Sequence, residues 1–400
     1  MTWLQRRNRG SRSRVVGASV LLAGLGTCLL VVAGCGSSDN SASGTDTTAT
    51  TASKPCNASI GVMTVLTGAA GPQGREQLHW AQLATDQFNE KNGTSIKIVE
   101  GDDQLDPAQG ATVAQQFVSD KNVVAVVGPE SDGTVDSAAP ILGKAGLVMV
   151  SPSATSSRLT EGKYKTFYRV IPPDSLQGSQ DASYMTDTLK VKKVLVIDDQ
   201  TAYSKGIADV VVPKLKEAGV DVQSDSVSGT NTDYSALVSK VSSDTDVVFL
   251  PWMLAANAQL FGDQMKEQGK TAVIFGTDGV FSPQDFTVDG SYLSTFSPDL
   301  VNDPDYADLV KEFEDRFGQF GAFGLPTYPA TQVILAAIKK VCDEGTSKPD
   351  PAAVAEAVKN TDIPTSVLGQ PIAFEPSGEM KDAKFYVYTI KNGKYVIAPQ

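Results

Sequence analysis

The sequence predicts an α/β protein of two lobes, in which each lobe is a parallel sheet flanked by helices. From Ala58 onward, short β-branched runs alternate with amphipathic stretches, a pattern typical of parallel strands joined by helices. About 345 residues of such chain exceed what one hydrophobic core usually serves, so two lobes are expected. The alternation pauses three times, which indicates three hinge crossings between the lobes.

The predicted strands are continuous apolar runs, as expected for strands buried on both faces. They cover residues 59–65, 95–100, 123–128, 147–151, 193–197, 246–251 and 272–276. Helices are expected between them, for example over 75–91 and 106–120, the second with Asp106 as its N-cap. Asn392-Gly393 separates two strand-like runs at the end of the chain and predicts a terminal β-hairpin on the second lobe.

The three pauses all contain proline, and they set the expected lobe boundaries. They fall at residues 169–174, 295–299 and 375–378. The resulting prediction is an N-terminal lobe of residues 57–171 plus 298–375 and a C-terminal lobe of residues 172–297 plus 376–400.

Residues 1–34 predict a secretion signal of the lipoprotein type. Five arginines precede an apolar run from Val15 to Gly34, and small residues lie directly before Cys35. The motif VVAGC resembles the lipobox of bacterial lipoproteins, in which the cysteine is lipidated and becomes the new N-terminus. The alternative is an uncleaved membrane anchor, because the run approaches the ~20 residues that a span needs. In both cases the remainder of the chain lies outside the cytoplasm.

Residues 35–56 predict a flexible tether, since they are rich in Ser and Thr and almost lack large apolar side chains. The full chain has a formal net charge of −12, and loss of the five leader arginines takes it to −17. So acidic a body argues against binding to nucleic acid or to anionic lipid surfaces. The acyl group on Cys35 is therefore expected to supply the membrane attachment.

The cysteine count agrees with an oxidising compartment. Of the four cysteines, Cys28 leaves with the signal and Cys35 is the lipidation site, so Cys56 and Cys342 remain. Two thiols outside the cytoplasm suggest one disulfide. The alternative is a buried free cysteine at Cys342, which lies in an apolar helical stretch.

Catalytic chemistry has little support in this sequence. His79 is the only histidine, which excludes zinc sites with several imidazoles, and it is expected to be an ordinary helix residue. The strongest enzyme alternative is a dinucleotide-dependent oxidoreductase, because the first strand leads into glycines 68, 71 and 74. That spacing is GxxGxxG rather than GxGxxG, and Pro72 removes a backbone N–H from the turn. We therefore expect no enzyme activity, cofactor or metal.

The chain after the tether resembles the branched-chain amino acid binding proteins of ABC importers. The motifs are LTGAAGPQG (66–74), DDQLDPAQGATVAQQFV (102–118) and VVGPESDGTVDSAAPILGKAGLVMVSPSATSSRLT (126–160), followed by VLVIDDQTAYSKG, DVVFLPWML and FGTDG in the same order. The resemblance implies the type I periplasmic binding protein fold, whose two lobes close on a ligand like a hinged trap. It also implies a monomer that binds an amino acid or an analogue and works with ABC permease subunits.

The resemblance places the ligand contacts on loops at strand ends. The α-carboxylate is expected at Ser131, Asp132 and Gly133 and at Ser153, Ala154 and Thr155. The backbone carbonyl of Ser153 and the side chain of Asp278 match the groups that receive the α-ammonium. Tyr203, Met253 and Phe323 are expected in the pocket wall. Open α/β sheets bind ligands at these strand ends on physical grounds as well.

Two positions depart from the family pattern. Asp132 replaces a common serine, and Gln73 replaces a common aromatic residue. In one interpretation Asp132 is the N-cap of the helix that follows, and Ser131 takes over the donor role. In the other, the ligand is a cation, amide or polyol suited to two acids, Asp132 and Asp278. A sensory receptor of the same fold is an alternative to the transport function.

Overall fold

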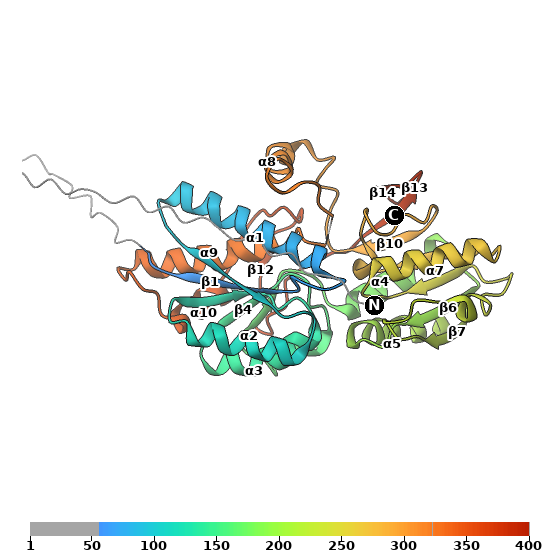
Figure 1. Cartoon of the computed structure of the whole chain (residues 1–400), viewed down its shortest axis with the longest axis horizontal. Helices are drawn as coiled ribbons and strands as arrows, with labels where there is room; N and C mark the ends of the chain where they lie inside the picture. The colour runs from blue at the N-terminus through green and yellow to red at the C-terminus, as the bar shows by residue number, and fades with distance from the viewer. Residues whose placement is uncertain (1–55, 322, 400) are drawn as a thin grey trace, which may run out of the picture. The chain divides into compact units, whose positions relative to one another are not determined.

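The computed structural model describes residues 56–321 and 323–399 (Figure 1). The predicted secretion signal, Cys35 and the tether up to residue 55 lie outside the described residues. Within the described ranges, none of the helices is long and apolar enough to cross a membrane.

The first sheet is entirely parallel, with the strand order β2-β1-β3-β4-β5. Its strands are β1 (Ser59–Thr64), β2 (Lys97–Asp102), β3 (Val123–Val127), β4 (Val148–Ser151) and β5 (Phe167–Arg169). Its helices are α1 (Gly71–Asn92), α2 (Pro107–Ser119), α3 (Asp132–Lys144), α9 (Thr327–Asp343) and α10 (Pro351–Lys359).

Alternate residues of the first sheet enter two separate apolar clusters, one on each face. Ile60 and Val62 of β1 pack in the cluster that contains the buried residues of α1 and α9. Met63, the next residue, packs with α2 and α3. The sheet is therefore covered by helices on both sides, as the apolar runs predicted (Figure 1).

The second sheet has the order β14-β13-β10-β9-β8-β6-β7 and ends in an antiparallel hairpin. Its strands are β6 (Lys193–Asp198), β7 (Asp221–Ser226), β8 (Val247–Leu250), β9 (Val273–Gly276), β10 (Tyr292–Thr295), β13 (Tyr386–Lys391) and β14 (Lys394–Ile397). Its helices are α4 (Asp174–Ser183), α5 (Ala202–Glu217), α6 (Ser235–Val238) and α7 (Ala255–Glu267). The remaining elements are α8 (Ala307–Phe317), β11 (Asp362–Ile363) and β12 (Ile372–Ala373).

The predicted two-lobed α/β fold with flanking helices is confirmed, and so is the terminal hairpin. Asp106 caps α2 as predicted, because its carboxylate accepts the backbone N–H groups of Ala108 and Gln109 at 2.7 and 3.0 Å. Five strands of the described residues had not been predicted: β5, β7, β10, β11 and β12. Strand β5 has only three residues, and β7 (DVQSDS) is a largely exposed edge strand with no apolar run.

The chain passes between the sheets three times: after β5, after β10 and before β13. The third passage lies further along than the pause at 375–378 indicated. The carbonyl of Gly378 accepts the backbone N–H of Arg169 on β5 at 3.1 Å, and Phe374 forms a β-bridge with Met380. Gly378 is therefore hydrogen-bonded to the first sheet, and Met380 packs in the apolar cluster on one face of that sheet.

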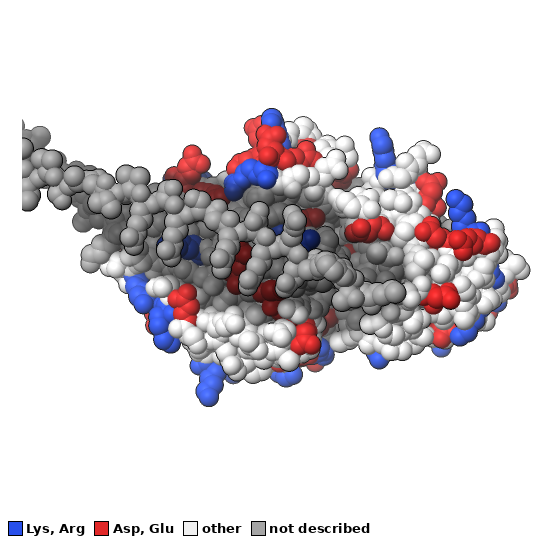
Figure 2. Space-filling view, viewed as in Figure 1, with Lys and Arg blue, Asp and Glu red and all other residues white. Residues whose placement is uncertain are grey.

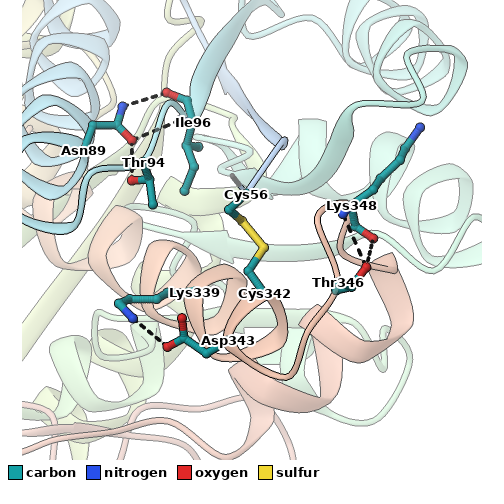
Figure 3. The surroundings of a disulfide bond; sticks show 9 residues. All are labelled: Cys56, Asn89, Thr94, Ile96, Lys339, Cys342, Asp343, Thr346 and Lys348. Carbon is teal, nitrogen blue, oxygen red and sulfur yellow. Dashed lines mark hydrogen bonds and ion pairs between the residues drawn. A yellow bond between two sulfur atoms is a disulfide. The ribbon is translucent and has the colours of Figure 1, made fainter. Parts of the chain in front are cut away.

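A disulfide joins Cys56 to Cys342, with the Sγ atoms 2.00 Å apart (Figure 3). Cys56 lies just before β1 and Cys342 lies in the last turn of α9, 286 residues away. The bond fastens the start of the first sheet to the helix that covers it.

The single histidine is an ordinary helix residue in the structure. His79 is partly buried, and its ring stacks on Phe317 with the centroids 4.3 Å apart. Burial and the nearby Arg75 lower its pKa. Gly74 has a packing role, because a Cβ at this position would lie 1.8 Å from the Val65 carbonyl oxygen. The glycines thus set the turn from β1 into α1.

Charge on the visible face is mixed. In Figure 2, Asp and Glu side chains gather in groups, among them on α8 at the top, and Lys and Arg side chains are scattered between them. Among the described residues, Lys311 forms an exposed ion pair with Asp315, and the partly exposed Arg316 pairs with Asp86.

Candidate ligand-binding site

A cavity of about 550 Å³ lies where the carboxyl ends of strands from both sheets meet. This volume is in the range of small-molecule sites. The first lobe contributes Leu105, Pro107, Ser131, Asp132 and Gly133 to its wall, and the second contributes Asp199, Gln200, Thr201, Ala202, Tyr203, Gly229, Thr230, Met253 and Leu254. Apolar side chains thus come from both lobes, with acidic and hydroxyl groups among them.

Ser131, not Asp132, is the N-cap of α3. The Ser131 hydroxyl accepts the Thr134 backbone N–H at 3.3 Å, and the Thr134 hydroxyl lies 3.3 Å from the Ser131 N–H in return, forming a capping box. The interpretation of Asp132 as the cap is therefore wrong. Ser131 takes that position because its backbone is extended (φ −106°, ψ 155°), whereas Asp132 is already the first helical residue.

The Asp132 carboxylate instead reaches the neighbouring loop, where its Oδ1 accepts the Ser156 backbone N–H at 2.9 Å. Only 4% of Asp132 is exposed. Burial raises the pKa of Asp132, while the Ser156 N–H and the charges of Arg169 and Arg158 act in the opposite direction. An acid therefore occupies the loop that was expected to hold a ligand carboxylate.

The loop of Ser153, Ala154 and Thr155 is buried, and two of its donors are already used. The backbone N–H groups of Ser153 and Ala154 donate to the Ser151 hydroxyl at 3.4 and 3.0 Å. The Thr155 hydroxyl is fully buried and makes no direct hydrogen bond with the described residues. The hydroxyl nevertheless lies close enough to the Asp174 carboxylate to lower the pKa of that acid.

Asp278 follows β9 and lies in the second lobe, 2% exposed. Its Oδ1 accepts the Gln177 side-chain amide at 2.7 Å and the Tyr203 hydroxyl at 2.7 Å. Burial raises the pKa of Asp278 to about 6, and these two hydrogen bonds oppose the rise. Tyr203 also lies 2.7 Å from the Thr277 hydroxyl, so Thr277 can donate to Tyr203 while Tyr203 donates to Asp278.

The remaining wall residues differ in their surroundings. Met253 lines the cavity, and its backbone N–H donates to Asp199 at 2.8 Å, a bond that joins the ends of β6 and β8. Of the predicted contacts, Ser153, Ala154, Thr155 and Asp278 are not among the residues that line this cavity, and neither is Phe323. It packs against Phe296 and borders a neighbouring cavity of about 420 Å³, which Gln73 also lines.

Asp174 was missed in the sequence, although it lies between the expected ligand contacts. It is 2% exposed, and its backbone N–H donates to the Thr155 carbonyl at 2.8 Å. Neither carboxylate oxygen makes a direct hydrogen bond with the described residues. Burial and the negative charge of Asp132 raise the pKa of Asp174 well above its ordinary value. Its position directly after Pro172-Pro173, at a predicted crossing, was the available signal.

Comparison with known proteins agrees with this geometry. The periplasmic binding protein family model matches residues 58–394. The chain is 32% identical over 345 residues to the Leu/Ile/Val-binding protein homolog 1 of Brucella suis, covering 84% of this chain and 90% of that protein. It is 31% identical over 350 residues to an amino acid binding protein of Pseudomonas aeruginosa, covering 84% and 91%.

The chain belongs to the branched-chain amino acid binding protein family. Its fold also matches the branched-chain amino acid substrate-binding protein LivJ of Streptococcus pneumoniae in complex with isoleucine. The TM-score is 0.76 at 24% identity, covering 86% of this chain and all of that one. Family and fold are those of solute-binding proteins rather than enzymes, and the family implies a location outside the cytoplasm.

No cluster of three or more His, Cys, Asp or Glu side chains in the described ranges could hold a metal ion. Three buried acids of this region come from different elements: Asp132 from α3, Asp174 from α4 and Asp278 from the turn after β9.

Glu130 is another buried acid, and it belongs to a hydrogen-bond network in the first lobe that includes Thr64 and Ser153. Thr64 Oγ1 lies 2.6 Å from Glu130 Oε2 and 2.8 Å from Gln77 Oε1, and one hydroxyl hydrogen cannot serve both. A protonated Glu130 resolves this, since it donates to Thr64 while Thr64 donates to Gln77. The circuit closes through Ser153, which accepts from Gln77 at 2.9 Å and donates to the Glu130 carbonyl at 2.9 Å.

This circuit predicts a pH-dependent stability. Burial raises the pKa of Glu130 from 4.5 to about 8, so the folded protein binds more protons than the unfolded chain between these values. The free energy of unfolding should therefore fall as pH rises from 5 to 8, by about 1.4 kcal/mol for each unit between the two pKa values. Glu130→Gln keeps a neutral acceptor and should make this fall less steep in urea denaturation, while Glu76, whose pKa is raised by desolvation to about 7, still titrates in the same range.

Glu90→Gln on the exposed side of α1 is the matched control, and it should leave the wild-type slope intact. An equal pH slope in wild type and Glu130→Gln would show that Glu130 is not the titrating group.

Proposed function

We propose that this protein is the solute-binding component of an ABC importer and captures an amino acid or an amino-acid-like solute in the cavity between its lobes. The observation that carries the proposal is the cavity itself, whose wall comes from the strand ends of both sheets. A solute that contacts Asp132 or Thr155 on one side and Asp278 or Tyr203 on the other would favour the closed arrangement, because it gains contacts only when the lobes approach.

The polar groups suit a ligand with a protonated amine. Asp278 is a buried acceptor, oriented by Gln177 and Tyr203, and the Ser153 carbonyl is the expected second acceptor. Leu105, Met253 and Leu254 offer apolar surface to the rest of the solute. Binding of this kind needs no covalent step, and closure would then present both lobes to permease subunits.

The predicted lipid on Cys35 completes the proposal. A body with net charge −17 gains nothing from an anionic membrane surface, so an acyl chain and the tether after it would keep the protein near its permease.

Isothermal titration calorimetry of the purified protein tests the function. The titrants are the twenty amino acids, small amides, polyamines and sugars, each at pH 7. We expect saturable binding by at least one solute with a protonated amine. Silence across the whole panel would contradict a solute-capture function.

A further inference from the structure

The N-terminus of α3 points to the chemistry of the solute. The first turn of a helix has free N–H groups and a positive dipole end, so it commonly binds an anion. Here Asp132 is the first helical residue, and its own carboxylate lies buried at this end. An acid of the protein thus lines the cavity at the loop where a ligand carboxylate was expected.

Other donors on the same side of the cavity are also used. Ser156 N–H donates to Asp132, and the N–H groups of Ser153 and Ala154 donate to Ser151. The Ser131 hydroxyl, 2.9 Å from the Thr134 hydroxyl, takes part in the capping box. Few donors therefore remain for an incoming anion.

The nearby positive charges are neutralised by other acids. Arg169 is bound to Glu379, and Arg158 pairs with Asp136 at 2.6 Å. Asp132 lines the cavity, Asp174 is hydrogen-bonded through its backbone to the Thr155 carbonyl, and Asp278 accepts from Tyr203, which lines the second lobe's side of the cavity.

The Asp174 carboxylate, 2% exposed, and the fully buried Thr155 hydroxyl make no direct hydrogen bond of ordinary geometry with the described residues. They do interact with each other, because the Thr155 hydroxyl lowers the pKa of Asp174. Asp174 is close enough to both Asp132 and Asp278 for each to raise its pKa. A buried acceptor without a donor is costly, so this arrangement favours a solute that brings donors.

The energetic balance opposes a carboxylate at this position. Two like charges a few ångströms apart repel, and the repulsion grows as burial lowers the effective dielectric. An ammonium or an amide N–H at the same place is attracted instead.

We propose that the solute of this protein is a cationic amine without a free carboxylate, such as an amino-acid amide, with an apolar body. This proposal rests on the proposed solute-capture function and narrows its ligand. The amine binds Asp278, the uncharged amide donates to Asp132 and the Asp174–Thr155 pair, and the apolar body contacts Leu105 and Met253.

The test compares L-leucinamide with L-leucine by calorimetry at pH 6.5, where an α-amine is mostly protonated. We expect wild type to bind L-leucinamide at least tenfold more tightly than L-leucine. Asp132→Ser, which leaves the Ser131 cap intact, should lower this ratio at least tenfold. Asp209→Ser, on the exposed face of α5, is the matched control and should keep the wild-type ratio.

Three outcomes would overturn the proposal: L-leucine binding wild type as tightly as L-leucinamide, an unchanged ratio in Asp132→Ser, or no binding of either compound to either protein. Circular dichroism checks that each variant is folded. Tight binding of L-leucine would leave solute capture intact and reject only the ligand class, whereas silence across the wider panel would reject both.

Discussion

Replacing Arg169 by methionine is expected to lower the free energy of unfolding by about 3–5 kcal/mol, the usual cost of breaking a buried ion pair from one side. Arg169 is fully buried on β5, and its guanidinium is bound to the Glu379 carboxylate. Its Nη1 also donates to the carbonyls of Ala154 and Ser156 at 3.1 and 2.9 Å. Methionine fills the space but leaves these acceptors without donors.

Urea denaturation at pH 7 measures this loss. Arg158→Met is the matched control, because Arg158 pairs with Asp136 while 40% of its side chain is exposed. An exposed pair contributes only about 0–1 kcal/mol. A loss in Arg169→Met no larger than that in Arg158→Met would show that the Arg169 network does not stabilise the loop at 154–156.

Removal of the Cys56–Cys342 disulfide is also expected to lower the free energy of unfolding substantially. We expect the double variant Cys56→Ser/Cys342→Ser to lose about 2–5 kcal/mol of unfolding free energy, because the bond closes a loop of 286 residues in the unfolded chain. Replacing both cysteines avoids a free thiol that could pair between molecules. Urea denaturation of a chain lacking residues 1–35 measures the change.

The reducing agent dithiothreitol provides the control for this experiment. It should destabilise the wild-type chain to a similar extent and leave the double variant unchanged. Two free thiols in the denatured, unreduced wild-type chain would contradict the disulfide directly.

The strands that are buried on both faces were the easiest part of the fold to predict from the sequence. The apolar runs at 59–65 and 123–128 could be read as strands because both faces of the sheet are buried, so every residue carries the signal. Strand β7 was not predicted because it is a polar edge strand. Backbone hydrogen bonds to β6 hold it in the sheet, and its side chains form no apolar run.

The site was harder to predict because its polar groups are paired across the fold. Ser131 and Asp132 are both common N-cap residues, so the sequence alone does not determine which of them caps α3. The extended backbone of Ser131 makes it the cap. Arg169 and Glu379 are 210 residues apart, and only the folded chain brings them together. The acid at 174 was visible in the sequence, but its lack of a hydrogen-bond partner was not.

The most direct test of solute capture is calorimetric titration of the tightest solute of the panel into wild type and Asp278→Asn. The variant keeps the size of the side chain and removes the negative charge of the carboxylate that accepts hydrogen bonds from Gln177 and Tyr203. We predict a loss of about 1–3 kcal/mol, roughly 5- to 150-fold in Kd, with Asp209→Asn on the exposed face of α5 as the unchanged control. Wild-type affinity in Asp278→Asn would contradict the placement of the ligand in this cavity.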